Sequence, residues 1–199
     1  MRVRVIGITG PSGSGKTLLS SRLAARGHAC IDADELYHSM LIPPSACLDA
    51  IRERFGNGVF LEDGSLDRRT LGSIVFGDAK KLELLNNTVL SIVIARVHEI
   101  IAELEVNGRD TVIVDAPTLI ESGFAEECDT VISVIAPKDI RIERISARDG
   151  IDKESAKARV SAQKDDGFYR SASDFVIYNS GDVDSFAAHV DELTELLGL

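Results

Sequence analysis

Three glycines, a lysine and a hydroxyl group stand close together near the start of the chain, in the stretch Gly10-Pro-Ser-Gly-Ser-Gly-Lys-Thr17. The spacing is G-x-x-x-x-G-K-[ST], the phosphate-binding P-loop motif, in which backbone N–H groups surround the phosphates of a nucleotide. We expect Lys16 to reach the β and γ phosphate oxygens and the Thr17 hydroxyl to ligate Mg²⁺. The loop residues expected to surround the triphosphate are Gly10, Pro11, Ser12, Gly13, Ser14 and Gly15.

Carboxylates follow two further apolar runs of the chain. Asp32 and Asp34 come directly after residues 28–31, and Asp115 ends the run 111–115. Ligands of open α/β sheets bind at the carboxyl ends of the strands. We therefore take Asp34 as the candidate that orients and deprotonates an attacking hydroxyl, a role typically worth on the order of 10²–10⁴-fold in rate. Asp32 is an alternative for this role or a metal ligand through water, and Asp115 is placed to hold Mg²⁺. Helix capping is the structural alternative for each of these acids.

Arginines form a second group of candidates. Arg141, Arg144 and Arg148 are spaced by three and then four residues, which puts them along one face of a helix. The segment 138–170 has nine bases and seven acids, so it is about +2 within a chain of −10. Arg144 and Arg148 would supply positive charge to a phosphoryl group in transfer. Arg68 and Arg69 begin another predicted helix and suit bidentate contact with phosphate. A solvated helix face is the alternative in both cases.

Composition limits the kinds of protein that this chain can be. With 199 residues, 44% of them hydrophobic, it can bury one α/β core. The net charge of −10, from 32 acids and 22 bases, argues against binding to nucleic acid or an anionic membrane. Three widely spaced cysteines indicate neither a disulfide framework nor a zinc site. We expect a soluble, cytoplasmic protein, either a monomer or a small homo-oligomer.

The candidate residues must be positioned by strands and helices that alternate along the chain. Apolar runs predict strands over residues 3–8, 28–31, 111–115, 130–135 and 173–178. Helical spacing predicts helices over residues 15–26, 45–55, 67–76, 78–106 with a break, 137–148, 152–164 and 183–197. This alternation predicts the α/β class, with a five-stranded doubly wound parallel sheet that carries the P-loop.

The predicted elements suggest three parts. Residues 1–34, 108–137 and 171–199 would form the P-loop nucleotide-binding core. Residues 35–107 lack a convincing strand and would form a helical insertion that binds the acceptor, and residues 138–170 would form a helical lid. Extra packing without any ligand is the alternative for the insertion.

Several motifs, taken in order, resemble the dephospho-coenzyme A kinase family. Beyond the P-loop, the similar stretches cover nearly the whole chain: Ile31-Asp-Ala-Asp34, Gly64-Ser-Leu-Asp-Arg-Arg-Thr-Leu71, Asp115-Ala-Pro-Thr-Leu-Ile-Glu121, Arg144 with Arg148, Gln163, and Ala172-Ser-Asp-Phe-Val-Ile-Tyr-Asn-Ser-Gly181. The resemblance implies a transferase of coenzyme A biosynthesis, which phosphorylates the ribose 3′-hydroxyl of dephospho-coenzyme A with MgATP.

The resemblance also implies roles for individual residues. Asp34 would be the base, Lys16 would bind phosphate, and Arg144 and Arg148 would belong to the lid. The other implied positions are Asn179 and Gly181 near the adenine, Asp34, Arg68, Arg69, Asp115 and Pro117 on the acceptor side, and Thr17, Asp32 and Asp115 at the metal.

The chain departs from the family pattern mainly on the acceptor side. Where the family usually has L-N-x-x-x-H-P, this chain has Leu90 and Ser91 in place of the histidine and proline. Tyr37 stands where a basic residue is common, and Thr118 replaces a leucine. Two alternatives therefore stay open: another small-molecule P-loop kinase with a diverged acceptor site, and a non-catalytic ATP-binding regulatory protein.

Overall fold

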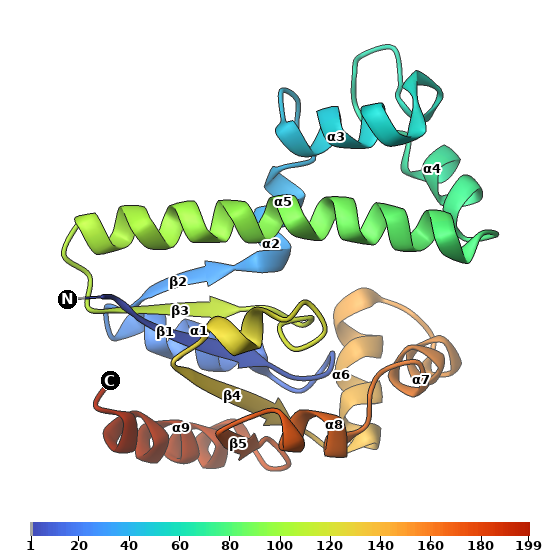
Figure 1. The fold of residues 1–199 in the computed structure, drawn as a ribbon. Helices are drawn as coiled ribbons and strands as arrows, with labels where there is room; N and C mark the ends of the chain where they lie inside the picture. The colour runs from blue at the N-terminus through green and yellow to red at the C-terminus, as the bar shows by residue number, and fades with distance from the viewer. Residues whose placement is uncertain (1) are drawn as a thin grey trace. The chain divides into compact units, whose positions relative to one another are not determined.

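The computed structural model describes residues 2–199, which divide into two compact units (Figure 1). The core unit comprises the chain up to Ile31 together with Leu104–Leu199, and the helical unit comprises Asp32–Glu103.

A five-stranded sheet forms the centre of the core unit. Its strands are β1 (Arg4–Thr9), β2 (Ala29–Asp32), β3 (Thr111–Asp115), β4 (Thr130–Ile135) and β5 (Phe175–Tyr178). They lie in the order β2-β3-β1-β4-β5, and β1 pairs in parallel with both β3 and β4, as β4 does with β5. Because β1 is central and the order reverses on either side of it, the predicted doubly wound parallel sheet is confirmed.

Both faces of the sheet are covered, as the continuous apolar run of β1 predicts. Ile6 and Ile8 point to one face, where they pack in a buried cluster with residues of α1 (Lys16–Ala25) and α9 (Val183–Leu197). Gly7 points to the other face, where a Cβ would stand 2.5 Å from Leu119 Cδ2 and 2.8 Å from Cys128 Sγ. The segment after β3 therefore packs so closely on β1 that only glycine fits there.

Three further helices follow β4 in the core unit. They are α6 (Lys138–Asp149), α7 (Lys153–Ser161) and α8 (Asp166–Ser171), and the short 3₁₀ helix η2 (Phe124–Glu127) precedes β4. Asp152 caps α7 as predicted, since its Oδ1 accepts from Ser155 N at 2.8 Å. Helix α8 was not predicted, and Gly167 within it lowers helix propensity. Asp165 compensates as N-cap by accepting from Phe168 N at 2.9 Å.

The helical unit has its own buried cluster, built from Leu41, Cys47, Leu48, Ile51, Val59, Leu71 and Val75. Its elements are α2 (Ala33–Ser39), α3 (Ala46–Phe55), η1 (Asn57–Val59), α4 (Arg68–Val75) and α5 (Ala79–Val106), whose last turn belongs to the core unit. The predicted break in the last of these is wrong, because α5 is one helix of 28 residues. Its sequence contains neither glycine nor proline to interrupt it.

The sequence analysis missed α2, although a signal for it is present. Asp32 is its N-cap and accepts from Glu35 N at 2.9 Å, and Glu35 stands at the third helical position. This is the acidic form of the capping box, which marks a helix start.

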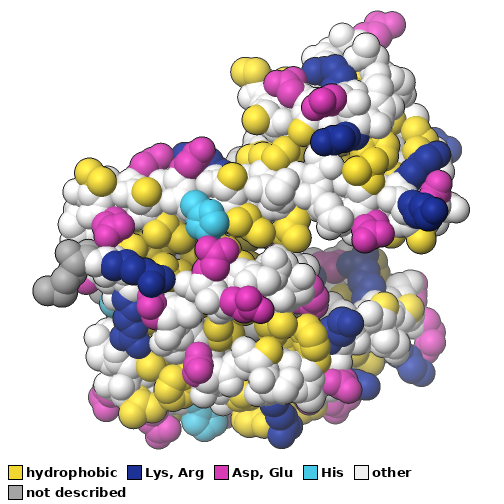
Figure 2. All heavy atoms as spheres, viewed as in Figure 1, with side chains coloured by type: hydrophobic (Ala, Val, Ile, Leu, Met, Phe, Trp, Pro, Cys, Tyr) yellow, Lys and Arg dark blue, Asp and Glu magenta, His cyan; other side chains and the backbone are white. Residues whose placement is uncertain are grey.

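Charges of both signs are spread over the surface. Figure 2 shows Asp and Glu side chains interspersed with Lys and Arg on the face that is drawn. Among residues 2–199, no helix combines the length and the apolar character that crossing a bilayer requires.

Candidate active site

The loop between β1 and α1 has a backbone that only glycine can form at three points. Gly10, Gly13 and Gly15 have φ values of 139°, 78° and 104°. A Cβ on Gly10 would stand 2.2 Å from Val134 O, and a Cβ on Gly15 would stand 2.1 Å from Asn179 Nδ2. The loop is therefore held against β4 and the end of β5 in a conformation that a side chain would exclude.

Lys16 is the first residue of α1 and folds back over the loop. Its Nζ donates to Gly10 O at 2.8 Å and to Pro11 O at 3.3 Å. The ammonium group and the N-terminal end of α1 thus bring positive charge to the same loop. A helix N-terminus that follows a glycine-rich loop is suited to bind phosphate.

The three arginines of α6 lie on one face, as predicted, and all three contact the loop. Arg141 Nε donates to Ser12 O at 3.0 Å, and Arg144 donates to Gly13 O at 3.3 Å and Ser14 O at 3.4 Å. Arg148 donates to the Ser12 hydroxyl at 3.4 Å. With Lys16, four cations therefore contact this loop in a chain whose net charge is −10.

Asn179, just after β5, joins the loop to α6. Its Nδ2 donates to Ser14 O at 2.7 Å and its Oδ1 accepts from Arg144 at 3.0 Å. The residue is 4% exposed, so both ends of its side chain are satisfied inside the protein. Its expected position near an adenine, and that of the exposed Gly181, stay predictions.

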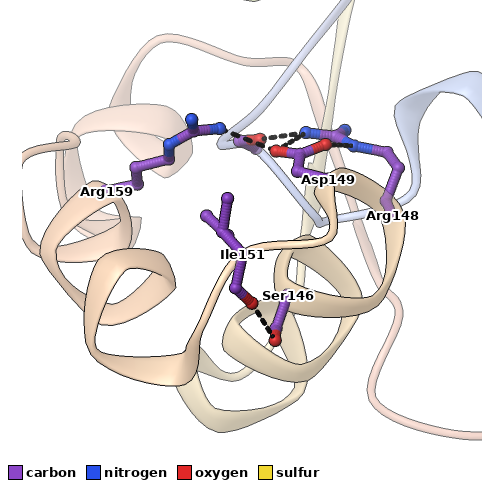
Figure 3. A network of polar contacts seen from close by, with 6 residues as sticks. Ser146, Arg148, Asp149, Ile151 and Arg159 are labelled. Atoms are coloured by element: carbon purple, nitrogen blue, oxygen red, sulfur yellow. Dashed lines mark hydrogen bonds and ion pairs between the residues drawn. The ribbon is translucent and has the colours of Figure 1, made fainter.

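The environments of the α6 arginines differ. Burial lowers the pKa of Arg141 and of Arg144. A hydrogen bond to Asp149 raises the pKa of Arg148, and the same contact lowers the pKa of the Asp149 carboxyl. Figure 3 shows Asp149 between Arg148 and Arg159. Its Oδ1 accepts from Arg148 Nε at 2.7 Å, and its Oδ2 accepts from Arg159 at 2.7 Å. The side chain of Arg148 is 61% exposed, and its guanidinium is held by a network that spans α6 and α7.

Asp115, at the end of β3, is bound to α1. It is 5% exposed, and its Oδ2 accepts from Ser20 Oγ at 2.9 Å. Ser20 lies one turn after Thr17 and also donates to Thr17 O at 3.2 Å. Oxygen ligands suit Mg²⁺, which proteins commonly hold through one or two side chains plus phosphates and water. The exposed Thr17 and the neighbouring Asp115 therefore fit the metal that the sequence predicts.

Pro117 lies at the same edge of the sheet as the loop. Its carbonyl oxygen accepts from the Thr9 hydroxyl at 3.3 Å, and Thr9 ends β1 directly before Gly10. The segment that directly follows β3 and the start of the loop are thus neighbours.

Of the acceptor-side candidates, Asp34, Arg68 and Arg69 lie in the helical unit, whereas Asp115 and Pro117 lie in the core unit. Asp32 caps α2, and Asp34 is exposed in its first turn, with Tyr37 one turn further on. Burial raises the pKa of Tyr37, while Arg68 acts to lower it. Arg68 and the exposed Arg69 begin α4, whose N-cap Asp67 accepts from Arg69 N at 3.1 Å. The roles of Asp32 and Asp34 in catalysis stay predictions.

Two residues at the loop were not assigned a role from the sequence. Arg141 was placed on the common face but left outside the site, and Gln163 entered only through the resemblance. In the structure Gln163 Oε1 accepts from Ser12 N at 3.2 Å and also from Arg141. The spacing of Arg141 and Arg144 was the available signal, but nothing in the sequence distinguishes a buried arginine from a solvated one.

A glycine-rich loop after the first strand of a parallel sheet, contacted by four cations, defines a P-loop nucleotide-binding protein of the α/β class. Within that class, the family model for dephospho-CoA kinase matches residues 4–185. The chain belongs to the dephospho-CoA kinase family, a family of kinases, and the resemblance noted in its motifs is confirmed.

Individual relatives agree with this assignment. The chain is 39% identical over 194 residues to a dephospho-CoA kinase of Thermobifida fusca, which covers 96% of this chain and 95% of that protein. A solved structure of dephospho-CoA kinase from Campylobacter jejuni matches with a TM-score of 0.71 and 25% identity, over 97% of this chain and 96% of that one. A solved Thermus thermophilus protein matches with a TM-score of 0.82 and 27% identity, over 99% of both chains.

Proposed function

We propose that this chain transfers the γ-phosphoryl group of ATP to the ribose 3′-hydroxyl of dephospho-coenzyme A, giving coenzyme A and ADP. Membership of the dephospho-CoA kinase family supports the reaction. The observation that carries the proposal is the convergence of four cations on the glycine-rich loop: Lys16, Arg141, Arg144 and Arg148.

The residues of the core unit would act on ATP. The N–H groups of the loop and of the first turn of α1 would bind the β and γ phosphates. Lys16 would exchange its bonds to Gly10 O and Pro11 O for phosphate oxygens. Arg148, whose side chain is largely exposed, would stabilise the negative charge that develops on the transferred group, while Arg144 keeps the loop in place.

Magnesium is a proposed component of the site. Thr17 would hold the ion directly, and Asp115 and Asp32 would hold it through water. When bound, Mg²⁺ neutralises charge on the β and γ phosphates. Asp115 is already oriented for this role by its bond to Ser20.

The residues of the helical unit would act on the acceptor. Asp34 would orient the ribose hydroxyl and accept its proton, and Arg68 and Arg69 would pair with the acceptor's phosphates. Leu90 and Ser91, which replace the usual histidine and proline, lie inside the uninterrupted α5. A proline in a helix interior would remove a backbone hydrogen bond, so its absence fits the continuity of this helix.

A coupled assay of ADP release with a panel of acceptors tests the proposal. We expect dephospho-coenzyme A to stimulate turnover and nucleosides or sugars to leave it unchanged. Lys16→Ala should abolish most of this activity, while Lys157→Ala, which removes an exposed charge from α7, should match the wild type. Stimulation by a different acceptor alone would show that the chain is a small-molecule kinase with another substrate. Tight ATP binding without transfer to any acceptor would favour a regulatory protein.

The setting of the reaction is also part of the proposal. The enzyme would work in the cytoplasm, as a monomer or a small homo-oligomer, with ATP and dephospho-coenzyme A as its partners and without nucleic acid or membrane. Light scattering of the purified protein measures the oligomeric state directly.

A further inference from the structure

Ser12, a residue of the P-loop, is hydrogen-bonded through both its backbone N–H and its C=O by the segment that follows β4. Arg141 Nε donates to Ser12 O at 3.0 Å, and Ser12 N donates to Gln163 Oε1 at 3.2 Å. Arg141 also donates to the same Gln163 oxygen. The two side chains and the Ser12 residue thus form a closed ring of three hydrogen bonds.

Burial makes this ring costly to break. Arg141 is 1% exposed and is among the largest fully buried side chains, whereas Gln163 is half-buried. A buried guanidinium needs hydrogen-bond acceptors, and both acceptors named here are neutral oxygens. The cation is therefore kept beside the loop by the loop's own carbonyl group.

The ring lies next to one of the constrained glycines of the loop. Gly13, the next residue, has φ 78°, and a Cβ on it would stand 3.0 Å from Arg141 O. Arg144, one turn further along α6, donates to Gly13 O. Any movement of Ser12 would therefore displace the glycine whose conformation shapes the loop.

We propose that Arg141 and Gln163 are positioning residues for ATP, which act through the backbone of Ser12 and not by touching the reacting atoms. The pair fixes the loop before ATP arrives, so that its N–H groups need no reorganisation on binding. The inference rests on the proposed function only in taking ATP as the ligand of the loop.

The geometry requires an arginine at position 141. Nε and a terminal nitrogen of the guanidinium donate in two fixed directions, one to Ser12 O and one to Gln163. A lysine has a single nitrogen on a flexible stem and does not hold the two acceptors in a fixed plane. Arg141→Lys should therefore lose part of the affinity for ATP.

Gln163 gives the sharper test, because it is half-buried and its replacement leaves the core packing intact. Gln163→Leu keeps the approximate volume and removes the acceptor, while Gln163→Glu keeps an acceptor for Ser12 N and Arg141. We expect the leucine variant to raise both the Kd for ATP, measured by calorimetry, and the KM for ATP by about tenfold. Its kcat should stay within about threefold. The glutamate variant should lose clearly less affinity than the leucine variant, although its added charge near the phosphates raises the Kd for ATP.

A double-mutant cycle tests whether Arg141 and Gln163 act through the same residue, Ser12. Arg141→Met alone should also raise the Kd for ATP by about tenfold, and the double variant should be no more than about threefold worse than either single one. Lys157→Gln, which removes an exposed charge from the same segment, is the control that should match the wild type. Melting temperatures identify a variant that has simply failed to fold.

The proposal is overturned if Gln163→Leu binds ATP as the wild type does, if the glutamate and leucine variants lose affinity equally, or if the two losses multiply. Calorimetry with ATP alone needs no acceptor. A wild type that binds ATP but does not phosphorylate dephospho-coenzyme A would therefore remove the proposed reaction and leave this inference standing.

Discussion

Asn179 Oδ1 accepts a hydrogen bond from the Arg144 guanidinium at 3.0 Å, while Nδ2 of the same side chain donates to Ser14 O at 2.7 Å. One buried amide thus holds both the loop and an arginine that contacts it. Asn179→Ala should lower the free energy of unfolding by about 1–3 kcal/mol, because Ser14 O keeps only the longer bond from Arg144 and Arg144 loses the amide oxygen as an acceptor. It should also raise the KM for ATP. Urea unfolding and steady-state kinetics measure the two effects.

Asn179→Asp separates these effects. A carboxylate still accepts from Arg144 but cannot donate to Ser14 O, and it adds a negative charge where phosphates would bind. We expect a larger rise in the KM for ATP than in the alanine variant. Equal KM values for the two variants would contradict the charge argument.

Gly15 and Gly27 form a matched pair for testing the loop. Both have positive φ, 104° and 94°, but a Cβ on Gly15 would stand 2.1 Å from Asn179 Nδ2, whereas nothing lies within 4 Å of one on Gly27. Gly27→Ala should cost only the backbone strain of about 1–2 kcal/mol. Gly15→Ala should destabilise more and should abolish ATP binding. Thermal unfolding and calorimetry compare the variants, and similar behaviour of both would refute the close packing at Gly15.

Asp34 and Asp32 are distinguished by the capping role of Asp32. Asp34→Asn should reduce kcat by on the order of 10²-fold while ATP binding stays intact, because the amide cannot accept the hydroxyl proton. Asp32→Asn keeps a good N-cap and should retain most of the activity, with a moderate rise in the Mg²⁺ requirement. Asp32→Ala should in addition destabilise α2 by about 0.5–2 kcal/mol. A loss of kcat in the Asp32→Asn variant alone would reverse the assignment of the base.

The Cys128 thiol makes the free energy of unfolding depend on pH in the alkaline range. Burial above all, and then the charges of Glu127 and Asp129, raise its pKa from the ordinary 9.0 to about 12. The folded state keeps the thiol protonated, so its contribution is fully present below pH 9.0 and is lost as the pH rises from there toward 12. The free energy of unfolding should therefore fall between pH 8 and pH 10.5. Cys128→Ala should show a shallower fall, and an unchanged slope would count against the buried thiol.

Local patterns in the sequence were enough to predict the parallel sheet and the P-loop. Strands β1, β3 and β4 are buried on both faces, and strands of this kind are recognised by an unbroken run of apolar residues. The glycines at 10, 13 and 15 are required by the backbone of their own loop. Helix caps such as Asp152 act within a few residues, so their effect is also written locally.

Contacts between distant segments decided the rest. Arg141 and Arg148 have the same residue type and lie on the same helix face, yet one is fully buried and the other exposed. Arg141 donates to Ser12 O and Gln163 Oε1, 129 and 22 residues away, whereas Arg148 is paired mainly with its neighbour Asp149. Asn179 likewise meets Ser14 across 165 residues. The sequence alone therefore determined that a phosphate-binding loop exists. The tertiary structure decided which cations support it, because burial depends on packing that no local pattern records.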